Sequence, residues 1–177
     1  PGARVDPISY GPMAYRLAEA GYLVVITPMP LNFAFFDIDQ ASDVLNEYPG
    51  INKWVIGGHS LGGAMAAQFA YENPTLFEGF IMFASFSSES TDLGELVNFP
   101  VLSIYGSEDG SIEEIRNSKE RLPDDAIMVE IDGGNHAQFG WYGTQSGDGK
   151  AEISRESQQE IIVEEVLLFL DTLLSEK

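Results

Sequence analysis

Short apolar runs alternate with amphipathic stretches along this chain, and that alternation limits the folds that it can adopt. Runs rich in β-branched and aromatic residues are predicted to be strands. Most of them are apolar at successive positions, which is typical of strands buried on both faces of a parallel sheet. The predicted strands are residues 22–28, 53–58, 79–85, 101–107 and 127–133.

The segments between these runs carry helical signals. Gly21 is a C-cap signal at the end of one helix, and Asp37 is a predicted N-cap for the second. The last helix carries an apolar stripe of Ile162, Val166, Leu170 and Leu173. We therefore expect an α/β fold, a mostly parallel sheet with helices on both faces. The predicted helices are residues 12–21, 37–50, a stretch directly after Ser60, 111–122 and 154–177.

Size and charge exclude several classes of function. A chain of 177 residues is long enough for one domain with a substantial core, so residues 1–177 are expected to form a single domain. The net charge of −19 should repel nucleic acid and anionic lipid, and no apolar run approaches the roughly 20 residues of a membrane span. The absence of cysteine excludes disulfides and thiolate chemistry. Localisation and oligomeric state are left open.

Residues 58–62 read Gly-His-Ser-Leu-Gly, the pattern Gly-x-Ser-x-Gly, between a predicted strand and a predicted helix. In that context Ser60 is a candidate nucleophile on a sharp turn, and the glycines two positions before and after it leave room for the turn. The following helix would present free N–H groups to a developing oxyanion. A purely structural glycine-rich turn is the alternative, which the flanking strand and helix disfavour.

A serine nucleophile requires a base and an acid that orients the base. Of the two histidines, His59 adjoins the nucleophile and is expected to point away into the structure, so His136 is the candidate base. Asp109 follows a predicted strand directly and is the favoured acid. Catalytic groups gather at the carboxyl edge of parallel sheets, where all three residues are predicted to lie. The alternative acids are Glu108, Asp132 and Asp92.

These motifs and their order along the chain resemble the α/β-hydrolase family, and within it the compact, lid-poor carboxylesterase and dienelactone-hydrolase-like group. The resemblance implies that Ser60 is the nucleophile, that His136 is the general base and then acid, and that Asp109 orients His136. It also implies two oxyanion-hole donors, the backbone N–H groups of Leu61 and Ala3, with Gly2 as the fallback for the latter. Dienelactone hydrolases proper use a cysteine nucleophile, so the serine here favours an ordinary serine esterase.

The resemblance has two consequences for architecture. The family's third strand would precede Pro1 and lie between the strands at 22–28 and 53–58, so the N-terminal strands are expected to be missing and the sheet to be interrupted there. The short stretch between Ser60 and Asp109 leaves no room for a large cap domain.

The expected function is a serine hydrolase that cleaves small or short-chain carboxylic esters through an acyl-enzyme on Ser60. A thioesterase, peptidase or acyltransferase of the same fold is the alternative, and a non-catalytic ligand-binding protein is a more distant one. No cofactor is expected, and no metal, because "SGDGKAE" at 146–152 lacks the ligand spacing of a calcium loop. Aromatic and apolar residues are candidates for the substrate pocket, although core or loop packing explains each equally well. They are Met29, Phe33, Phe139 and Trp141, with Phe35 and Tyr142 as further candidates.

Overall fold

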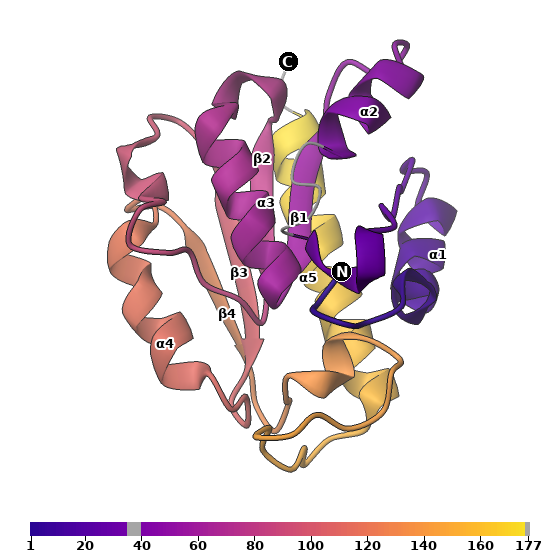
Figure 1. Cartoon of the computed structure of the whole chain (residues 1–177), viewed down its shortest axis with the longest axis vertical. Helices are drawn as coiled ribbons and strands as arrows, with labels where there is room; N and C mark the ends of the chain where they lie inside the picture. Colours follow the sequence, from indigo (N-terminus) through magenta and orange to yellow (C-terminus); the bar gives the residue numbers. More distant parts are fainter. Residues whose placement is uncertain (35–39, 176–177) are drawn as a thin grey trace.

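A computed structural model describes residues 1–34 and 40–175 (Figure 1). Its sheet has the strand order β1-β2-β3-β4, and each adjacent pair is parallel. The strands are β1 (Val55–His59), β2 (Gly79–Phe83), β3 (Val101–Gly106) and β4 (Ile127–Ile131). The α-helices are α1 (Gly11–Glu19), α2 (Gln40–Glu47), α3 (Leu61–Glu72), α4 (Ile112–Asn117) and α5 (Arg155–Ser175). Short 3-10 turns lie at Pro7–Tyr10, Pro30–Asn32, Pro74–Leu76, Leu93–Glu95, Ser118–Arg121 and Ala137–Phe139.

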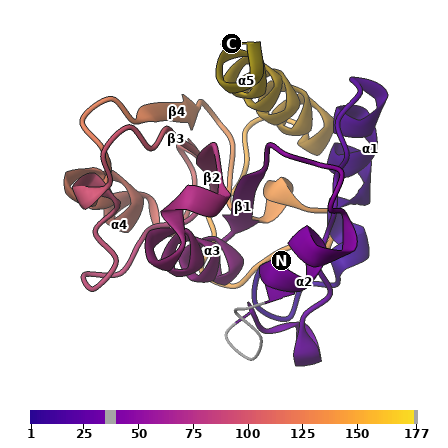
Figure 2. The ribbon, with the colours of Figure 1, turned by 90° about the horizontal axis from the view of Figure 1, so that it is seen from above.

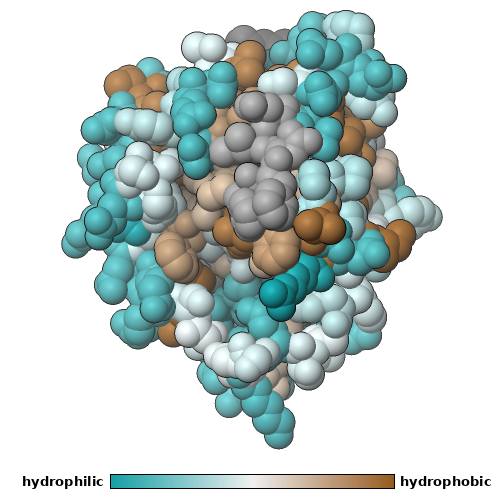
Figure 3. All heavy atoms as spheres, viewed as in Figure 1, coloured by the Kyte–Doolittle hydropathy of each residue, from teal (hydrophilic) through white to brown (hydrophobic). Residues whose placement is uncertain are grey.

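Helices cover both faces of the sheet, as predicted. Side chains alternate along a strand, so β2 contributes Ile81 to the core on one face and Met82 to the core on the other. Figure 2 shows α5 on one side of the sheet and α3 on the opposite side. The predicted apolar stripe of α5 is confirmed: three of its members are buried in the first core and Leu173 packs against that core. Hydrophilic residues cover most of the face drawn in Figure 3, in keeping with the net charge of −19.

The prediction of a strand at residues 22–28 is wrong, because this segment joins no ladder. A strand requires a neighbour for its N–H and C=O groups. Residues 22–27 instead form one wall of a mostly apolar cavity of about 450 Å³, and β1 and the two residues before it line the cavity from the sheet. The cavity lies where the sequence predicts an interruption of the sheet.

Other boundaries differ in detail from the expected ones. The first helix ends in Ala20 as its C-cap, and Gly21 follows with the φ of +100° that favours glycine. The helix predicted at 111–122 divides into α4 and a 3-10 turn. The stretch between β2 and β3 contains the short turn Leu93–Glu95, so there is no large cap domain there. Phe35 and the predicted N-cap Asp37 lie outside the described residues. Within the described part, none of the helices has the length and apolarity to span a membrane.

The apolar stripe of α5 gives a direct test of the packing. Ile162 is fully buried, whereas Leu168 on the same helix is 63% exposed. We expect Ile162→Ala to lower the free energy of unfolding by about 2–4 kcal/mol, because it leaves a cavity, and Leu168→Ala to lower it by less than about 1 kcal/mol. Urea denaturation of both variants measures the difference. Equal losses would contradict the burial described for α5.

Candidate active site

Ser60 lies at a strained corner between β1 and α3. Its φ of 55° and ψ of −129° are uncommon for a residue other than glycine, and such strain concentrates at functional sites. A Cβ on Gly58 would lie 2.3 Å from the carbonyl oxygen of Gly62, so the flanking glycines leave room for the corner, as predicted. The Ser85 hydroxyl donates a hydrogen bond of 2.7 Å to the carbonyl oxygen of Ser60 and supports the corner from the end of β2.

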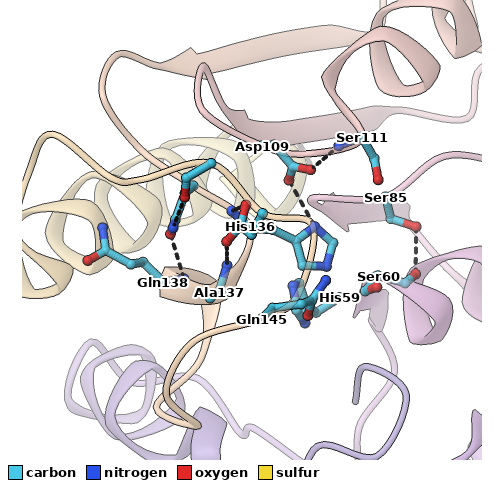
Figure 4. A network of polar contacts seen from close by, with 12 residues as sticks. His59, Ser60, Ser85, Asp109, Ser111, His136, Ala137, Gln138 and Gln145 are labelled. Carbon is cyan, nitrogen blue, oxygen red and sulfur yellow. Dashed lines mark hydrogen bonds and ion pairs between the residues drawn. The ribbon is translucent and has the colours of Figure 1, made fainter.

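His136 and Asp109 form a buried hydrogen bond (Figure 4). The distance between His136 Nδ1 and Asp109 Oδ2 is 2.9 Å, and both side chains are almost fully buried. The other carboxylate oxygen, Asp109 Oδ1, accepts the backbone N–H of Ser111 at 2.8 Å. His136 Nε2 is buried and has no hydrogen-bond partner within the described part of the chain. The carboxylate therefore fixes one ring nitrogen and leaves the other free to act as a base.

The alternative acids do not reach His136. Asp92 accepts the backbone N–H of Gly94 at 3.0 Å and caps a 3-10 turn. Glu108 has a distant contact of 3.5 Å with the Ser107 hydroxyl, and Asp132 is exposed. Of the four candidate acids, Asp109 is the one that the structure brings into contact with the candidate base.

His59, the residue next to Ser60, packs beside the candidate base. The ring centroids of His59, which adjoins Ser60, and His136 are 4.7 Å apart. Figure 4 shows Ser60 and Asp109 at different sides of the His136 ring. The Ser60 hydroxyl has no hydrogen bond to His136 Nε2 among the described contacts. Such bonds are often long in a free enzyme and tighten when substrate binds.

His59 is buried, as expected, but it does not point away from the site. Its ring packs beside His136 and against Phe139, with 5.8 Å between the centroids of the His59 and Phe139 rings. His59 Nδ1 lies 2.8 Å from the Tyr10 hydroxyl, which accepts the backbone N–H of Gly2 at 2.9 Å. Burial lowers the pKa of His59 well below its usual value, and the nearby His136 adds to this. Burial also raises the pKa of Tyr10 to about 12. His59 is therefore a neutral side chain that packs between the N-terminal segment and the candidate base.

The N-terminal segment lies against the start of α3, where an oxyanion hole is expected. A Cβ on Gly62 would lie 2.2 Å from the carbonyl oxygen of Pro1. The N–H of Gly2 is already bonded to Tyr10, so the fallback donor is occupied. Among the described hydrogen bonds, none uses the N–H of Ala3 or of Leu61.

The structure separates the four residues predicted to line one substrate pocket. Met29 lines the apolar cavity beside β1. Phe139 is 2% exposed and belongs to the same hydrophobic core as Ile162. Trp141 is 43% exposed and lies 5.5 Å from the Arg155 guanidinium. Phe33 lies under the guanidinium of Arg4, at 5.7 Å.

Several residues that the site depends on were not predicted. Gln158 is fully buried, and its amide bonds both the N–H and the C=O of Asn135, next to His136. A glutamine on a predicted amphipathic helix carries no signal that it is buried. Asp148 lies in the "SGDGKAE" segment and contacts the loop of His136. Among the described residues, no cluster of three or more potential ligands is suited to a metal ion.

The neutral state of His59 predicts a pH dependence of stability. Below its ordinary pKa of 6.5 the unfolded chain protonates His59, whereas the folded protein does not. Stability therefore falls as the pH falls below 6.5, by at most about 1.4 kcal/mol per pH unit from this group. The variant His59→Gln lacks this contribution. Urea denaturation at pH 7.5 and 5.5 should show a smaller loss for the variant than for the wild type, and equal losses would contradict a buried neutral His59.

Comparisons with known proteins agree with the fold. Residues 1–160 match the sequence profile described as the Alpha/beta hydrolase family. No curated protein matches the chain by sequence. Similar solved structures include a monoacylglycerol lipase of Paleococcus ferrophilus, with 17% identity, coverage of 92% of this chain and 90% of that chain, and a TM-score of 0.67. A carboxylesterase of Nitrososphaera gargenis has 15% identity, coverage of 98% and 89%, and a TM-score of 0.67. A dienelactone hydrolase of Anabaena variabilis has 19% identity, coverage of 92% and 81%, and a TM-score of 0.65. The chain belongs to the α/β-hydrolase family.

Proposed function

We propose that this protein is a serine hydrolase that cleaves small or short-chain carboxylic esters through an acyl-enzyme on Ser60. The observation that carries the proposal is the buried contact of 2.9 Å between His136 Nδ1 and Asp109 Oδ2. This contact leaves His136 Nε2 unbonded among the described residues, near a serine on a strained strand-to-helix corner. A nucleophile, a base and a carboxylate that orients the base are the three groups that acyl transfer requires.

In the proposed reaction, His136 Nε2 takes the proton of the Ser60 hydroxyl as Ser60 Oγ attacks the ester carbonyl carbon. The N–H groups of Leu61 and Ala3 stabilise the oxyanion that forms. His136 then gives its proton to the leaving alcohol as the C–O bond breaks. Water, deprotonated by His136, attacks the acyl-enzyme, and the acid leaves while Ser60 recovers its proton. Asp109 keeps the imidazole in place and stabilises its charged form.

Two features support small, uncharged or weakly charged esters as substrates. A large cap that could enclose a long acyl chain is absent between β2 and β3, where Leu93–Glu95 is the helical element. The net charge of −19 disfavours strongly anionic substrates. Esterases and lipases among the similar solved structures agree with ester hydrolysis.

Thioesters, amides and acyl transfer use the same chemistry and are the alternatives. A panel of p-nitrophenyl esters of increasing acyl length, tested beside p-nitroanilides and acyl thioesters, separates these classes. We expect the highest kcat/KM for acetyl and butyryl esters. Hydrolysis of amides or thioesters with esters inert would move the assignment to a peptidase or a thioesterase.

Replacing the nucleophile should abolish turnover without unfolding the protein. We expect Ser60→Ala to lower kcat for p-nitrophenyl butyrate by about 10³-fold or more, because the acyl-enzyme can no longer form. Its melting temperature should not fall, since alanine keeps the size of the corner residue. Ser90→Ala, at an exposed serine, is the matched control and should keep wild-type activity. Full activity in Ser60→Ala would refute the proposed mechanism.

The choice of Asp109 as the acid has its own test. Asp109→Asn should lower kcat by about 10³–10⁴-fold, because an amide does not hold the imidazole in the required tautomer. The same substitution at the exposed Asp132, a rejected candidate for the acid, should leave kcat within a factor of two. Steady-state kinetics with p-nitrophenyl butyrate gives both values. A large effect at position 132 and none at 109 would reverse the assignment.

A further inference from the structure

We infer that Asp148 is a positioning residue for His136, and that residues 147–149 form a strap that sets the spacing between His136 and Asp109. The inference rests on the proposed function and extends it to a segment that carries no assigned role. This segment is the "SGDG" part of residues 146–152, which lack the ligand spacing of a calcium loop.

The carboxylate of Asp148 bonds the base residue itself. Its Oδ1 accepts the backbone N–H of His136 at 3.1 Å, and its Oδ2 accepts the backbone N–H of Ala137 at 2.8 Å. Hydrogen bonds to an ionised carboxylate are shorter and stronger than bonds between neutral groups. Two such bonds to consecutive peptide groups fix both the position and the orientation of the backbone that carries the imidazole.

The strap is bonded to the acid loop as well as to the base loop. The N–H of Gly149 donates to the carbonyl oxygen of Glu108 at 3.0 Å, and its own carbonyl accepts the Asn135 side-chain amide at 2.8 Å. Glu108 and Asn135 directly precede Asp109 and His136 in the chain. One short segment therefore holds the residues next to both members of the His136–Asp109 pair.

The backbones of the strap and of the acid loop are in direct contact, so the strap lies close to that loop. A Cβ on Gly110 would lie 2.1 Å from the carbonyl oxygen of Gly147, and a Cβ on Gly149 would lie 2.2 Å from that of Glu108. Real Cβ contacts of this length do not occur, so any side chain at either position would push the strap away from the acid loop. Gly110 in the acid loop and Gly149 in the strap therefore permit the close approach that brings Asp148 to the base loop.

The two hydrogen bonds that Asp148 accepts argue against a cation at its carboxylate. Both of its carboxylate oxygens face N–H donors, which a cation would have to displace. Calcium takes six to eight oxygen ligands. Asp148 therefore serves the base loop through hydrogen bonds.

Asp148→Asn is the test, with Asp132→Asn as the matched control. An amide keeps one acceptor oxygen but turns an NH₂ group toward an N–H donor. We expect kcat for p-nitrophenyl butyrate to fall about 10- to 100-fold with KM within a factor of two, because positioning of the base affects the chemical step. The control should match the wild type. A kcat within a factor of two of the wild type would overturn the inference.

A spectroscopic arm separates positioning from a general loss of structure. In the wild type the proton shared by His136 Nδ1 and Asp109 should give a far-downfield NMR signal. In folded Asp148→Asn this signal should weaken or move upfield, whereas in Asp132→Asn it should not change. An unchanged signal in Asp148→Asn would overturn the inference even if activity fell.

Two further measurements cover the remaining outcomes. If Asp148→Asn does not fold, kcat is measured for Asp148→Glu instead. The hydrogen bonds of Asp148 are then tested by amide hydrogen exchange of the wild type. Slow exchange at both His136 and Ala137 supports the strap, and unprotected exchange overturns it. If wild-type protein hydrolyses no ester, the proposed function fails, but the NMR signal and the exchange rates still decide whether Asp148 positions His136.

Discussion

The hydrogen bond between His136 and Asp109 is the contact on which the rest of the site depends. It requires the loop after β3 and the loop after β4 to meet. Each loop contributes one polar side chain that is almost fully buried. Adjacent parallel strands bring the two loops to one edge of the sheet. Glycine then permits the final approach, since a Cβ on Gly106 would lie 2.2 Å from the carbonyl oxygen of Gly134. The parallel strands thus bring the two loops to the same edge of the sheet, and the close packing of the loop backbones sets the short distance between His136 and Asp109.

His59 connects this contact to the rest of the molecule. Its ring fills the space between His136 and Tyr10, and Tyr10 holds the N–H of Gly2. A charged imidazole would be costly in this buried position, so His59 remains neutral and acts through packing. The segment that supplies the proposed second oxyanion donor, Ala3, is therefore anchored by the residue beside the nucleophile. His59 therefore contributes both to the folding stability of the N-terminal segment and to the geometry of the candidate site.

The sequence was sufficient to predict the parts of the fold that follow from local periodicity and chain order. Four predicted strands are present, and the stripe through Ile162 and Val166 faces the core. The absence of a strand at 22–28 could not be predicted from local sequence, because the apolar pattern there satisfies the local rules. A strand also requires a neighbour, and the described residues pair with this segment in no ladder. Likewise, the sequence pattern placed Ser60, Asp109 and His136 at strand ends, and the structure joins the last two.

Residues that act through loop contacts escaped the sequence analysis. The carboxylate of Asp148 reaches peptide groups more than ten positions earlier in the chain, so its role depends on loop geometry that no short pattern encodes. Gln158 is polar and helical, and its burial is explained by its two hydrogen bonds to the peptide N–H and C=O of Asn135, which the sequence does not reveal. The burial of His59 is predictable from its position next to Ser60. Its packing partners, His136 and Phe139, are not.

We propose that Ser60 is the nucleophile and that His136 activates it. The most direct measurement is labelling by a fluorophosphonate, which forms a covalent bond with an activated serine, followed by intact mass determination and peptide mapping. We expect one adduct, located on Ser60, in the wild type, and none in Ser60→Ala. We also expect much slower labelling in His136→Gln, which keeps the serine but removes the base. An adduct on another residue, or no adduct on folded wild-type protein, would contradict the role of Ser60 as the activated nucleophile.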